Sequence, residues 1–575
     1  MEAVPPPPVP AARQGHRFWF PLSVGIVAAL ALGAIELRPE LERGPQFWLR
    51  FAVVLLALVL SLVWFVFLSR LPWRVRLLTV AVLAAVGLGL TLALRVDGTV
   101  DGRSIPRLAW KWSAHPERVF SPRSTPPRAE TAPPPALLKD VPQFFGPRRD
   151  GVVTGVGLAR DWTKSPPREL WRQPIGTGWS AFAVVGDRAY TQEQRGEEEW
   201  VSCYDVLSGR LLWSHARRAR FFQWQAGEGP HATPTVDRGR VFAYGATGIL
   251  DCLDAATGAP VWSRAVLEEN KLENLEWGAS SSPLLVADLV IVTGGQTAGP
   301  TVLAYDRQTG EPKWRSGTDR ASYSSPIAAT LAGTSVVLSF NAATLTAHDL
   351  ATGTVLLSHR WGSDKAPKAA QPIAVGGDRI FVTSGYGMGC ELLQITAGAG
   401  GKLSAESIWK NIRLKAQFNS VAMRNGFFYG LDDGFLACVE IATGTRRWKG
   451  GLYGSGQTLL ADDLILVQTE RGPVVLAEAN PESFRELGRI AALSSKTWNH
   501  PTLAGRYLLV RNDREAVCYE LPVAGATSAA NQRVFSKQVF PVILSAAKNP
   551  LGHPRLTKAS LLPLDSSRRS DDNQV

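Results

Sequence analysis

The chain has 575 residues, of which 45% are hydrophobic, 19% charged and 9% aromatic, with 53 Gly and 39 Pro. This composition excludes wholesale disorder, a collagen-like chain and a disulfide-rich miniprotein. The net charge of +12 is unevenly spread: residues 1–168 carry +10 and residues 523–575 carry +4, which leaves −2 for residues 169–522. Because the main body is nearly neutral, the sequence predicts no nucleic-acid partner.

Three uncharged apolar segments open the chain, at residues 18–35, 51–69 and 77–94. Each is close to the ~20 residues that an α-helix needs to cross a bilayer. Lipid cannot form hydrogen bonds with the backbone, so a spanning segment must form them internally as a helix, and we expect three transmembrane helices. The first segment could instead be a signal peptide, but the small-residue pattern near residues 31–33 is poor for cleavage and two more spans follow. An uncleaved membrane anchor in contact with lipid is therefore expected.

The arginines beside the spans favour one orientation. With the N-terminal tail, residues 1–17, in the cytoplasm, five arginines lie inside and three lie in the first outer loop, although three more follow the third span. Positive charge accumulates on the cytoplasmic side. The sequence thus favours a bacterial inner membrane location with the body on the periplasmic side. Residues 96–143 are rich in Pro and Arg and are expected to form a linker.

One phrase recurs along the body of the chain. The first four full copies are spaced by 43 to 52 residues, and the fifth follows after 91 residues, which fits two units. Such a period is typical of a solenoid or a propeller. Each unit holds short alternating apolar runs between turns, which indicates four strands and hence a propeller blade. The copies are CYDVLSGRLLW at 203–213, CLDAATGAPVW at 252–262, AYDRQTGEPKW at 304–314, AHDLATGTVLL at 347–357 and CVEIATGTRRW at 438–448, with degenerate units ending near 409 and 488.

The strand inventory predicts the number of blades. Seven units run from about residue 178 to residue 488, and three further strand signals occupy residues 500–522. The isolated segment ELWRQP at 169–174 has the form of the missing fourth strand. Pairing it with the C-terminal strands closes an eighth blade and removes free sheet edges. We therefore predict an all-β, eight-bladed propeller at 144–522, with seven blades as the alternative, and a disordered tail at 523–575.

The residues that define the repeat are expected to be structural. The aspartates can cap the turn, the glycines can adopt positive φ, and the tryptophans can pack against the neighbouring blade. The set comprises Asp205, Gly209, Trp213, Asp254, Gly258, Trp262, Asp306, Gly310, Trp314, Asp349, Gly353, Gly444 and Trp448.

The repeated A-x-D-x-x-T-G-x-x-x-W phrase resembles the quinoprotein-type, or PQQ-like, β-propeller repeat. The segments FFGPRRDGV at 144–152 and ELWRQPIGTGWSAFAVVGDRAY at 169–190 resemble the start of bacterial members of that superfamily. The resemblance covers about 144–522 and implies the fold and an exocytoplasmic location. It does not imply an activity, because the superfamily includes pyrroloquinoline-quinone (PQQ) dehydrogenases and also cofactor-free propellers, among them a lipoprotein scaffold of outer-membrane protein assembly.

The resemblance raises the question of whether this chain is an enzyme. Dehydrogenases of the superfamily stack the quinone on the propeller axis with Ca²⁺ and an Asp base, and many carry a disulfide between adjacent cysteines. This chain has five cysteines, none adjacent, and no CxxCH. Four of them, Cys203, Cys252, Cys438 and Cys518, occupy equivalent positions, which is typical of small buried hydrophobic residues. We predict no catalytic residue and no metal ligands.

A ring of residues where the inner strands begin is predicted to line the axial funnel. The ring is polar but almost uncharged, whereas a Ca²⁺ site usually needs several carboxylates. Glu276 is the nearest carboxylate and no partner for it is evident. The candidate ligand-binding residues are Trp179, His231, Thr233, Glu276, Ser281, Ser324, Gln371, Asn419, Gln457 and His500, with Ser180 beside them.

These observations predict a membrane-anchored, non-catalytic binding or scaffold platform without a cofactor. A protein partner is expected on the blade edges or on loops such as 214–229, which mixes aromatic and basic residues. The alternative is a PQQ-dependent dehydrogenase that oxidises a sugar or an alcohol, needs PQQ and Ca²⁺, and passes electrons to membrane quinone. A ligand sensor ranks third, because a tail of about 17 residues is short for a cytoplasmic effector.

Overall fold

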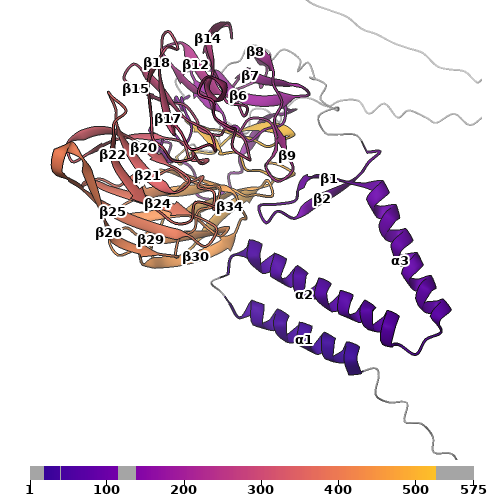
Figure 1. Ribbon diagram of the computed structural model, residues 1–575. Coiled ribbons are helices and arrows are strands. Elements are labelled where there is room, and N and C mark those ends of the chain that lie inside the picture. Colours follow the sequence, from indigo (N-terminus) through magenta and orange to yellow (C-terminus); the bar gives the residue numbers. More distant parts are fainter. Residues whose placement is uncertain (1–18, 39–40, 114–137, 526–575) are drawn as a thin grey trace, which may run out of the picture. The chain divides into compact units, whose positions relative to one another are not determined.

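The computed structural model describes residues 19–38, 41–113 and 138–525. Three long apolar helices come first (Figure 1), which confirms the three expected spans by length and composition. The second begins at residue 43 rather than 51, because the helix continues through Arg50 where the uncharged segment does not. The helices are α1 (Trp19–Glu36), α2 (Arg43–Val63) with the π-helical turn η1 (Trp64–Leu68), and α3 (Trp73–Ala93).

A β-hairpin follows the third helix without a gap. Strand β1 (Leu94–Thr99) pairs antiparallel with β2 (Pro106–Trp110). The first part of the segment expected as a linker, 96–143, is therefore ordered structure. The rest of that segment falls largely at 114–137, and this stretch, like the tails 1–18 and 526–575, lies outside the described residues.

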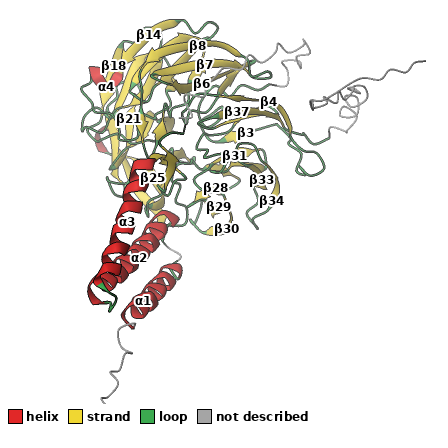
Figure 2. Cartoon of the chain, turned by 90° about the vertical axis from the view of Figure 1, so that its right-hand side faces the viewer, coloured by secondary structure: helices red, strands yellow, loops and turns green. Residues whose placement is uncertain are grey.

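Eight four-stranded units make up the body, and Figure 2 shows them as blades around a common axis. The predicted blade count is confirmed. Blade 1 has β5 (Ala183–Val185), β6 (Arg188–Arg195), β7 (Glu198–Asp205) and β8 (Leu211–Arg218); blade 2 has β11 (Thr235–Asp237), β12 (Arg240–Tyr244), β13 (Ile249–Asp254) and β14 (Pro260–Ala265); blade 3 has β15 (Leu284–Val286), β16 (Leu289–Thr293), β17 (Val302–Asp306) and β18 (Pro312–Ser316); blade 4 has β19 (Ile327–Leu331), β20 (Thr334–Phe340), β21 (Thr344–Asp349) and β22 (Val355–Arg360).

The second half of the ring repeats this order. Blade 5 has β23 (Ile373–Ala374), β24 (Arg379–Ser384), β25 (Gly389–Ala397) and β26 (Leu403–Asn411); blade 6 has β27 (Ala422–Arg424), β28 (Phe427–Asp432), β29 (Phe435–Glu440) and β30 (Arg446–Leu452); blade 7 has β31 (Gln457–Ala461), β32 (Leu464–Gln468), β33 (Val474–Glu478) and β34 (Glu486–Ile490), with β3 (Val152–Val153) added; blade 8 has β35 (Thr502–Ala504), β36 (Tyr507–Arg511), β37 (Glu515–Glu520) and β4 (Arg168–Pro174). Short elements between blades are β9 (Phe222–Gln223), β10 (Gly227–Glu228), α4 (Val266–Glu269) and η4 (Ala399–Gly401).

The ring closes through the pairing of strands that the sequence predicted. Strand β4 lies antiparallel to β37, and Trp171 stands opposite Cys518 in that register. The same pairing, a cysteine opposite a tryptophan, recurs at Cys203 and Trp213 in blade 1. All five cysteines are free and buried, so they are small core residues and not a disulfide framework.

The tryptophans of the repeat join neighbouring blades. Trp171 of blade 8 donates its indole N–H to the backbone oxygen of Val206 in blade 1, at 2.8 Å. Its ring also faces Gly209, where an added Cβ would lie 2.6 Å from Cδ2 of the indole. Glycine is thus required at this turn both by its φ of +72° and by the ring above it. Trp213, Trp262, Trp314, Trp409 and Trp448 make the equivalent donation to the next blade.

Blade 7 has no tryptophan at the repeat position, and a tryptophan from outside the repeat takes its place. Gly488 of β34 pairs with Leu476 as Trp448 pairs with Cys438 one blade earlier. An added Cβ at Gly488 would lie 2.8 Å from Cβ of Trp162, which is buried. The segment before the first blade therefore supplies the large apolar group that the degenerate unit does not contain.

Candidate functional site: the axial pocket

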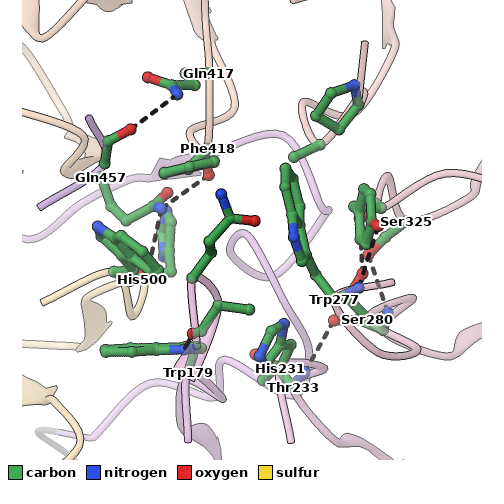
Figure 3. Close-up of a pocket in the computed structure, with 18 of the residues that line it drawn as sticks. Trp179, His231, Thr233, Trp277, Ser280, Ser325, Gln417, Phe418, Gln457 and His500 are labelled. Carbon is green, nitrogen blue, oxygen red and sulfur yellow. Dashed lines mark hydrogen bonds between the residues drawn. The ribbon is translucent and has the colours of Figure 1, made fainter. Parts of the chain in front are cut away.

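A cavity of about 320 Å³ lies on the propeller axis. Figure 3 shows side chains from several blades converging on it. Its lining combines the aromatic rings of Phe, Tyr and Trp with side-chain amides, hydroxyls and imidazoles. The lining residues are Asp101, Gly102, Ser104, Phe144, Trp179, Gln225, Ala226, His231, Thr233, Trp277, Ser280, Ser282, Tyr323, Ser325, Pro367, Ala369, Tyr386, Gln417, Phe418, Gln457, Trp498 and His500.

The segment at 141–153 crosses beneath this cavity and ties the blades together. The guanidinium of Arg149 donates to the backbone oxygens of Ser282 and Pro283 in the loop before blade 3, both at 3.0 Å. The backbone oxygen of Arg149 accepts from Gln371 Nε2, before blade 5, at 3.1 Å. Phe145 packs edge-on against His500, with ring centroids 5.2 Å apart. Because these contacts span the ring, the segment forms a floor under the pocket.

The loop of the β1–β2 hairpin forms one wall of the pocket. The N–H of Gly102 donates to Oε1 of Glu470 at 2.6 Å, and the Nζ of Lys496 donates to Oγ1 of Thr99 at 2.9 Å. A Cβ at Gly102 would lie 3.0 Å from Cβ of Ser455, so the loop approaches blade 7 closely. The hairpin that directly continues the third membrane helix is thus part of the candidate site, which sequence reasoning did not foresee.

The segment at 214–229, expected to dock a protein partner, begins within β8 and also contributes to the pocket rim. Gln225 and Ala226 line the cavity. The backbone oxygen of Gln225 accepts from Oγ1 of Thr99 at 3.3 Å, which links this loop to the hairpin. Part of the loop remains available to a partner, since Phe222 is 55% exposed.

Five of the eleven funnel residues named from the sequence line the pocket. Trp179, His231, Thr233, Gln457 and His500 do so. Ser180, Ser281, Ser324, Gln371 and Asn419 are buried beside the cavity in bonds to the protein itself, and Glu276 is exposed outside it.

Most of the residues that do not line the cavity are one position away from a residue that does; the exception is Gln371, which is two positions from Ala369. Ser281 lies between Ser280 and Ser282, both of which face the cavity, while Ser281 Oγ accepts the backbone N–H of Thr293 at 3.3 Å. Neighbouring side chains of an extended chain point to opposite sides. The same one-residue offset separates Glu276 from Trp277, Ser324 from Ser325, and Asn419 from Phe418. The aromatic residues next to the predicted polar ones in the sequence were the signal that could have located the pocket lining.

Aromatic side chains form two platforms in the cavity. Trp277 stacks on Tyr323 with ring centroids 5.2 Å apart and an interplanar angle of 28°. Trp498 lies 4.9 Å from Trp179 and 5.0 Å from Phe418, centroid to centroid, in tilted pairs. Such surfaces bind the flat apolar face of a ligand.

The pocket is nearly free of charge. Among the described residues that line it, Asp101 alone is a charged type, and its carboxylate is paired with Arg103 at 2.6 Å. Burial lowers the pKa of His231 and of His500 to about 4, so both imidazoles are neutral at physiological pH. Burial also lowers the pKa of Lys496 to about 8. Its ammonium lies behind the lining, 4.1 Å from the ring centroid of Trp498.

The donor set does not fit PQQ with Ca²⁺. Within the described part of the chain no group of three or more His, Cys, Asp or Glu side chains is placed to hold a metal ion. The nearby carboxylate of Glu470 is taken by the N–H groups of Gly102, Trp498 and Ser455. Calcium prefers several carboxylate and carbonyl oxygens, and no cationic side chain among the lining residues faces the three carboxylates of PQQ.

Comparisons with known proteins agree with the fold. The sequence model of the family described as outer membrane protein assembly factor BamB matches residues 197–450. No curated protein matches the chain. The chain is an eight-bladed β-propeller of the PQQ-like type, preceded by three long apolar helices.

Three solved structures are similar to the chain at low identity. The crystal structure of BamB from Moraxella catarrhalis is 17% identical and covers 62% of this chain and 98% of its own, with a TM-score of 0.46. The quinohemoprotein alcohol dehydrogenase from Comamonas testosteroni is 13% identical and covers 66% of this chain and 80% of its own, with a TM-score of 0.49. A computationally designed protein, Ika8, is 12% identical and covers 62% of this chain and all of its own, with a TM-score of 0.43.

Proposed function

We propose that this chain is a membrane-anchored, non-catalytic binding protein that holds a small uncharged ligand in the axial pocket of its propeller. The observation that carries the proposal is the lining: aromatic platforms, side-chain amides and hydroxyls, with a single carboxylate already paired to Arg103. A concave, largely apolar cavity with a few convergent polar groups is the usual form of a ligand site.

The lining residues favour binding over chemistry. His231 lacks a partner for its buried Nε2 among the described residues, and no carboxylate orients that imidazole as a general base requires. The Nε2 of His500 lies 3.1 Å from the backbone oxygen of Thr458, which leaves this nitrogen engaged with the backbone. The rival dehydrogenase would need a divalent cation and an oriented base beside its quinone, and the described lining residues offer neither a set of carboxylates for the cation nor a carboxylate that orients an imidazole.

Dye-linked turnover of the full chain in lipid nanodiscs tests this proposal. Nanodiscs that carry the chain are incubated with PQQ and Ca²⁺, and reduction of an artificial acceptor is followed with a panel of sugars and primary alcohols. We expect the rate to equal that of empty nanodiscs. A substrate-dependent rate that disappears in the Trp498→Leu variant would overturn the proposal and establish the dehydrogenase.

A second candidate function is a platform for protein partners, and the family match favours it, because that family is described as an assembly factor. Outer strands carry exposed apolar residues that a partner strand or loop could cover, such as Ile408 on β26 and Leu452 on β30. A photo-crosslinking side chain at either position should capture a protein in cells, whereas the same group at the buried Thr233 should not. Absence of adducts at both outer positions would contradict this candidate.

We also propose that the propeller lies on the periplasmic side of the bacterial inner membrane. The arginine distribution around the three helices supports this orientation. The helices themselves support membrane anchoring in either orientation.

A further inference from the structure

We infer that the ligand of the axial pocket is a neutral saccharide unit, a monosaccharide or disaccharide. This inference rests on the proposed function and names the chemical class that the pocket would take. It is carried by an arc of hydroxyl donors facing a set of aromatic platforms, in a cavity where the one charged type among the described lining residues, Asp101, is paired with Arg103.

The hydroxyl arc is built by the repeat itself. Thr233, Ser282 and Ser325 stand in the loops before the inner strands of blades 2, 3 and 4 and all line the cavity. The N–H of Ala181 donates to Oγ1 of Thr233 at 3.0 Å, the N–H of Thr233 to Oγ of Ser282 at 3.0 Å, and the N–H of Ser282 to Oγ of Ser325 at 2.9 Å.

Each of these hydroxyl oxygens already accepts a hydrogen bond from the preceding blade. A hydroxyl has one donor in addition to its lone pairs. For Thr233 and Ser282 no acceptor of that hydrogen is found among the described residues. The backbone therefore positions the oxygens and leaves hydroxyl hydrogens free to meet acceptors on a ligand.

Two ring nitrogens of the lining also lack partners. The Nε1 of Trp277 and the Nε2 of His231 are buried and have no hydrogen-bond partner within the described residues. A buried polar group without a hydrogen-bond partner is unfavourable. A purely hydrocarbon ligand would leave both nitrogens and the hydroxyl arc unsatisfied, so the pocket favours a ligand with polar groups on its perimeter.

The aromatic platforms set the shape of the ligand. The pyranose ring of a sugar presents C–H groups on its faces and hydroxyls around its edge. Its faces suit the rings of Trp277 with Tyr323 and of Trp498 with Phe418, because the negative face of an aromatic ring attracts polarised C–H groups. Its edge hydroxyls suit the side-chain amides of Gln225 and Gln417, which also line the cavity.

The charge and size of the cavity narrow the class of ligand further. An acidic or amino sugar would lose its hydration in a cavity whose lining holds no free counter-charge, which is unfavourable. The volume of about 320 Å³ is near the lower end of the ~300–1,000 Å³ of ligand pockets, so one or two rings fit better than a long chain.

The test is a binding titration of the full chain in phosphatidylcholine nanodiscs, since maltoside and glucoside detergents would compete for the pocket. The probes are maltose, cellobiose, trehalose and N,N′-diacetylchitobiose, with glucuronate and glucosamine as charged analogues and naphthalene as an apolar ring. Intrinsic tryptophan fluorescence and calorimetry report binding. We expect at least one neutral disaccharide to bind saturably, and the charged analogues and naphthalene to bind at least about tenfold more weakly.

Variants assign the binding to the pocket. Trp277→Phe retains a ring but removes the N–H, and Ser282→Ala removes one hydroxyl of the arc; each should weaken binding about tenfold. The matched control is Trp200→Leu on β7, whose indole lies outside the cavity under Arg195. Equal melting temperatures of the variants exclude misfolding as the cause.

The outcomes separate this inference from the proposed function. If every neutral saccharide fails, or binds equally well in Trp277→Phe and Ser282→Ala, the saccharide class is wrong. Saturable binding of naphthalene alone would then leave an uncharged-ligand pocket and overturn only the saccharide class. PQQ with Ca²⁺ binding in the same cavity, with turnover, would overturn both.

Discussion

The ammonium of Lys496 donates to Oγ1 of Thr99 at 2.9 Å and contacts two pocket tryptophans, 4.1 Å from the ring centroid of Trp498 and 5.0 Å from that of Trp179. This contact joins the hairpin that continues the third membrane helix to the loop before blade 8. A titratable group is thus buried where the hairpin that continues the membrane helices meets the binding pocket.

The pKa of Lys496 predicts a specific dependence of stability on pH. Burial lowers this pKa to about 8, against 10.5 in the unfolded chain, although Asp513 raises it. Between these values the unfolded state binds more protons, so the contribution of Lys496 to stability rises with pH, by at most about 1.4 kcal/mol for each pH unit. The melting temperature of the wild type should rise relative to that of Lys496→Met from pH 8 to pH 10. If the melting temperatures of the two proteins changed with pH in parallel, the claim that the ammonium of Lys496 is buried would be contradicted.

The hairpin wall depends on the absence of a side chain at Gly102. A Cβ there would clash with the side chains of Ser455 and Phe418, so Gly102→Ala should displace the loop and expose 94–110 to hydrogen exchange. Adding Ser455→Gly removes the nearest atoms and should restore much of the protection. Hydrogen exchange measured by mass spectrometry distinguishes these states, and unchanged exchange in Gly102→Ala would show that the hairpin does not rest on blade 7.

Two glycines with the same backbone angle test the contact between blades. Gly209 and Gly239 both have φ of +72°, but an added Cβ meets Trp171 at Gly209 and nothing within 4 Å at Gly239. Alanine at Gly239 should cost about 1–2 kcal/mol for the left-handed conformation alone. Alanine at Gly209 should cost a further ~1–3 kcal/mol for the clash. Equal losses in denaturant unfolding would mean that Trp171 does not pack on that turn.

The orientation of the chain can be read with an impermeant thiol reagent. All five native cysteines are buried, so they give little background labelling. Thr257→Cys, in an exposed turn of blade 2, should be labelled in intact spheroplasts, whereas Gln14→Cys should be labelled after lysis alone. The reverse pattern would place the propeller in the cytoplasm.

The repeat predicted the fold because each blade needs the same local chemistry. Gly209, Gly258 and Gly310 each face the tryptophan of the preceding blade, so one structural requirement appears as a sequence period. The closure through residues 169–174 was also predictable, since an incomplete fourth strand leaves an edge that must pair.

The pocket was harder to predict because it depends on phase and on distant segments. The sequence located the loops that reach the axis but assigned Ser281 where Ser280 and Ser282 line the cavity, an error of one residue that turns a side chain to the other side. Gly102 and Ser104 reach the pocket through a hairpin that is hundreds of residues from its contacts on Glu470 and Lys496. No local pattern reports such a contact.

Calorimetric titration of the full chain in nanodiscs with PQQ and Ca²⁺ tests the central claim most directly. Asp101 is the one charged type among the described residues that line the pocket, and it is already paired, so we expect no saturable heat of binding and no change in the melting temperature. A ligand present at 100 times its Kd would stabilise the fold by about 2.7 kcal/mol, which is readily measured. A saturable one-to-one heat that Trp498→Leu abolishes would contradict the account and show that the propeller holds a redox cofactor.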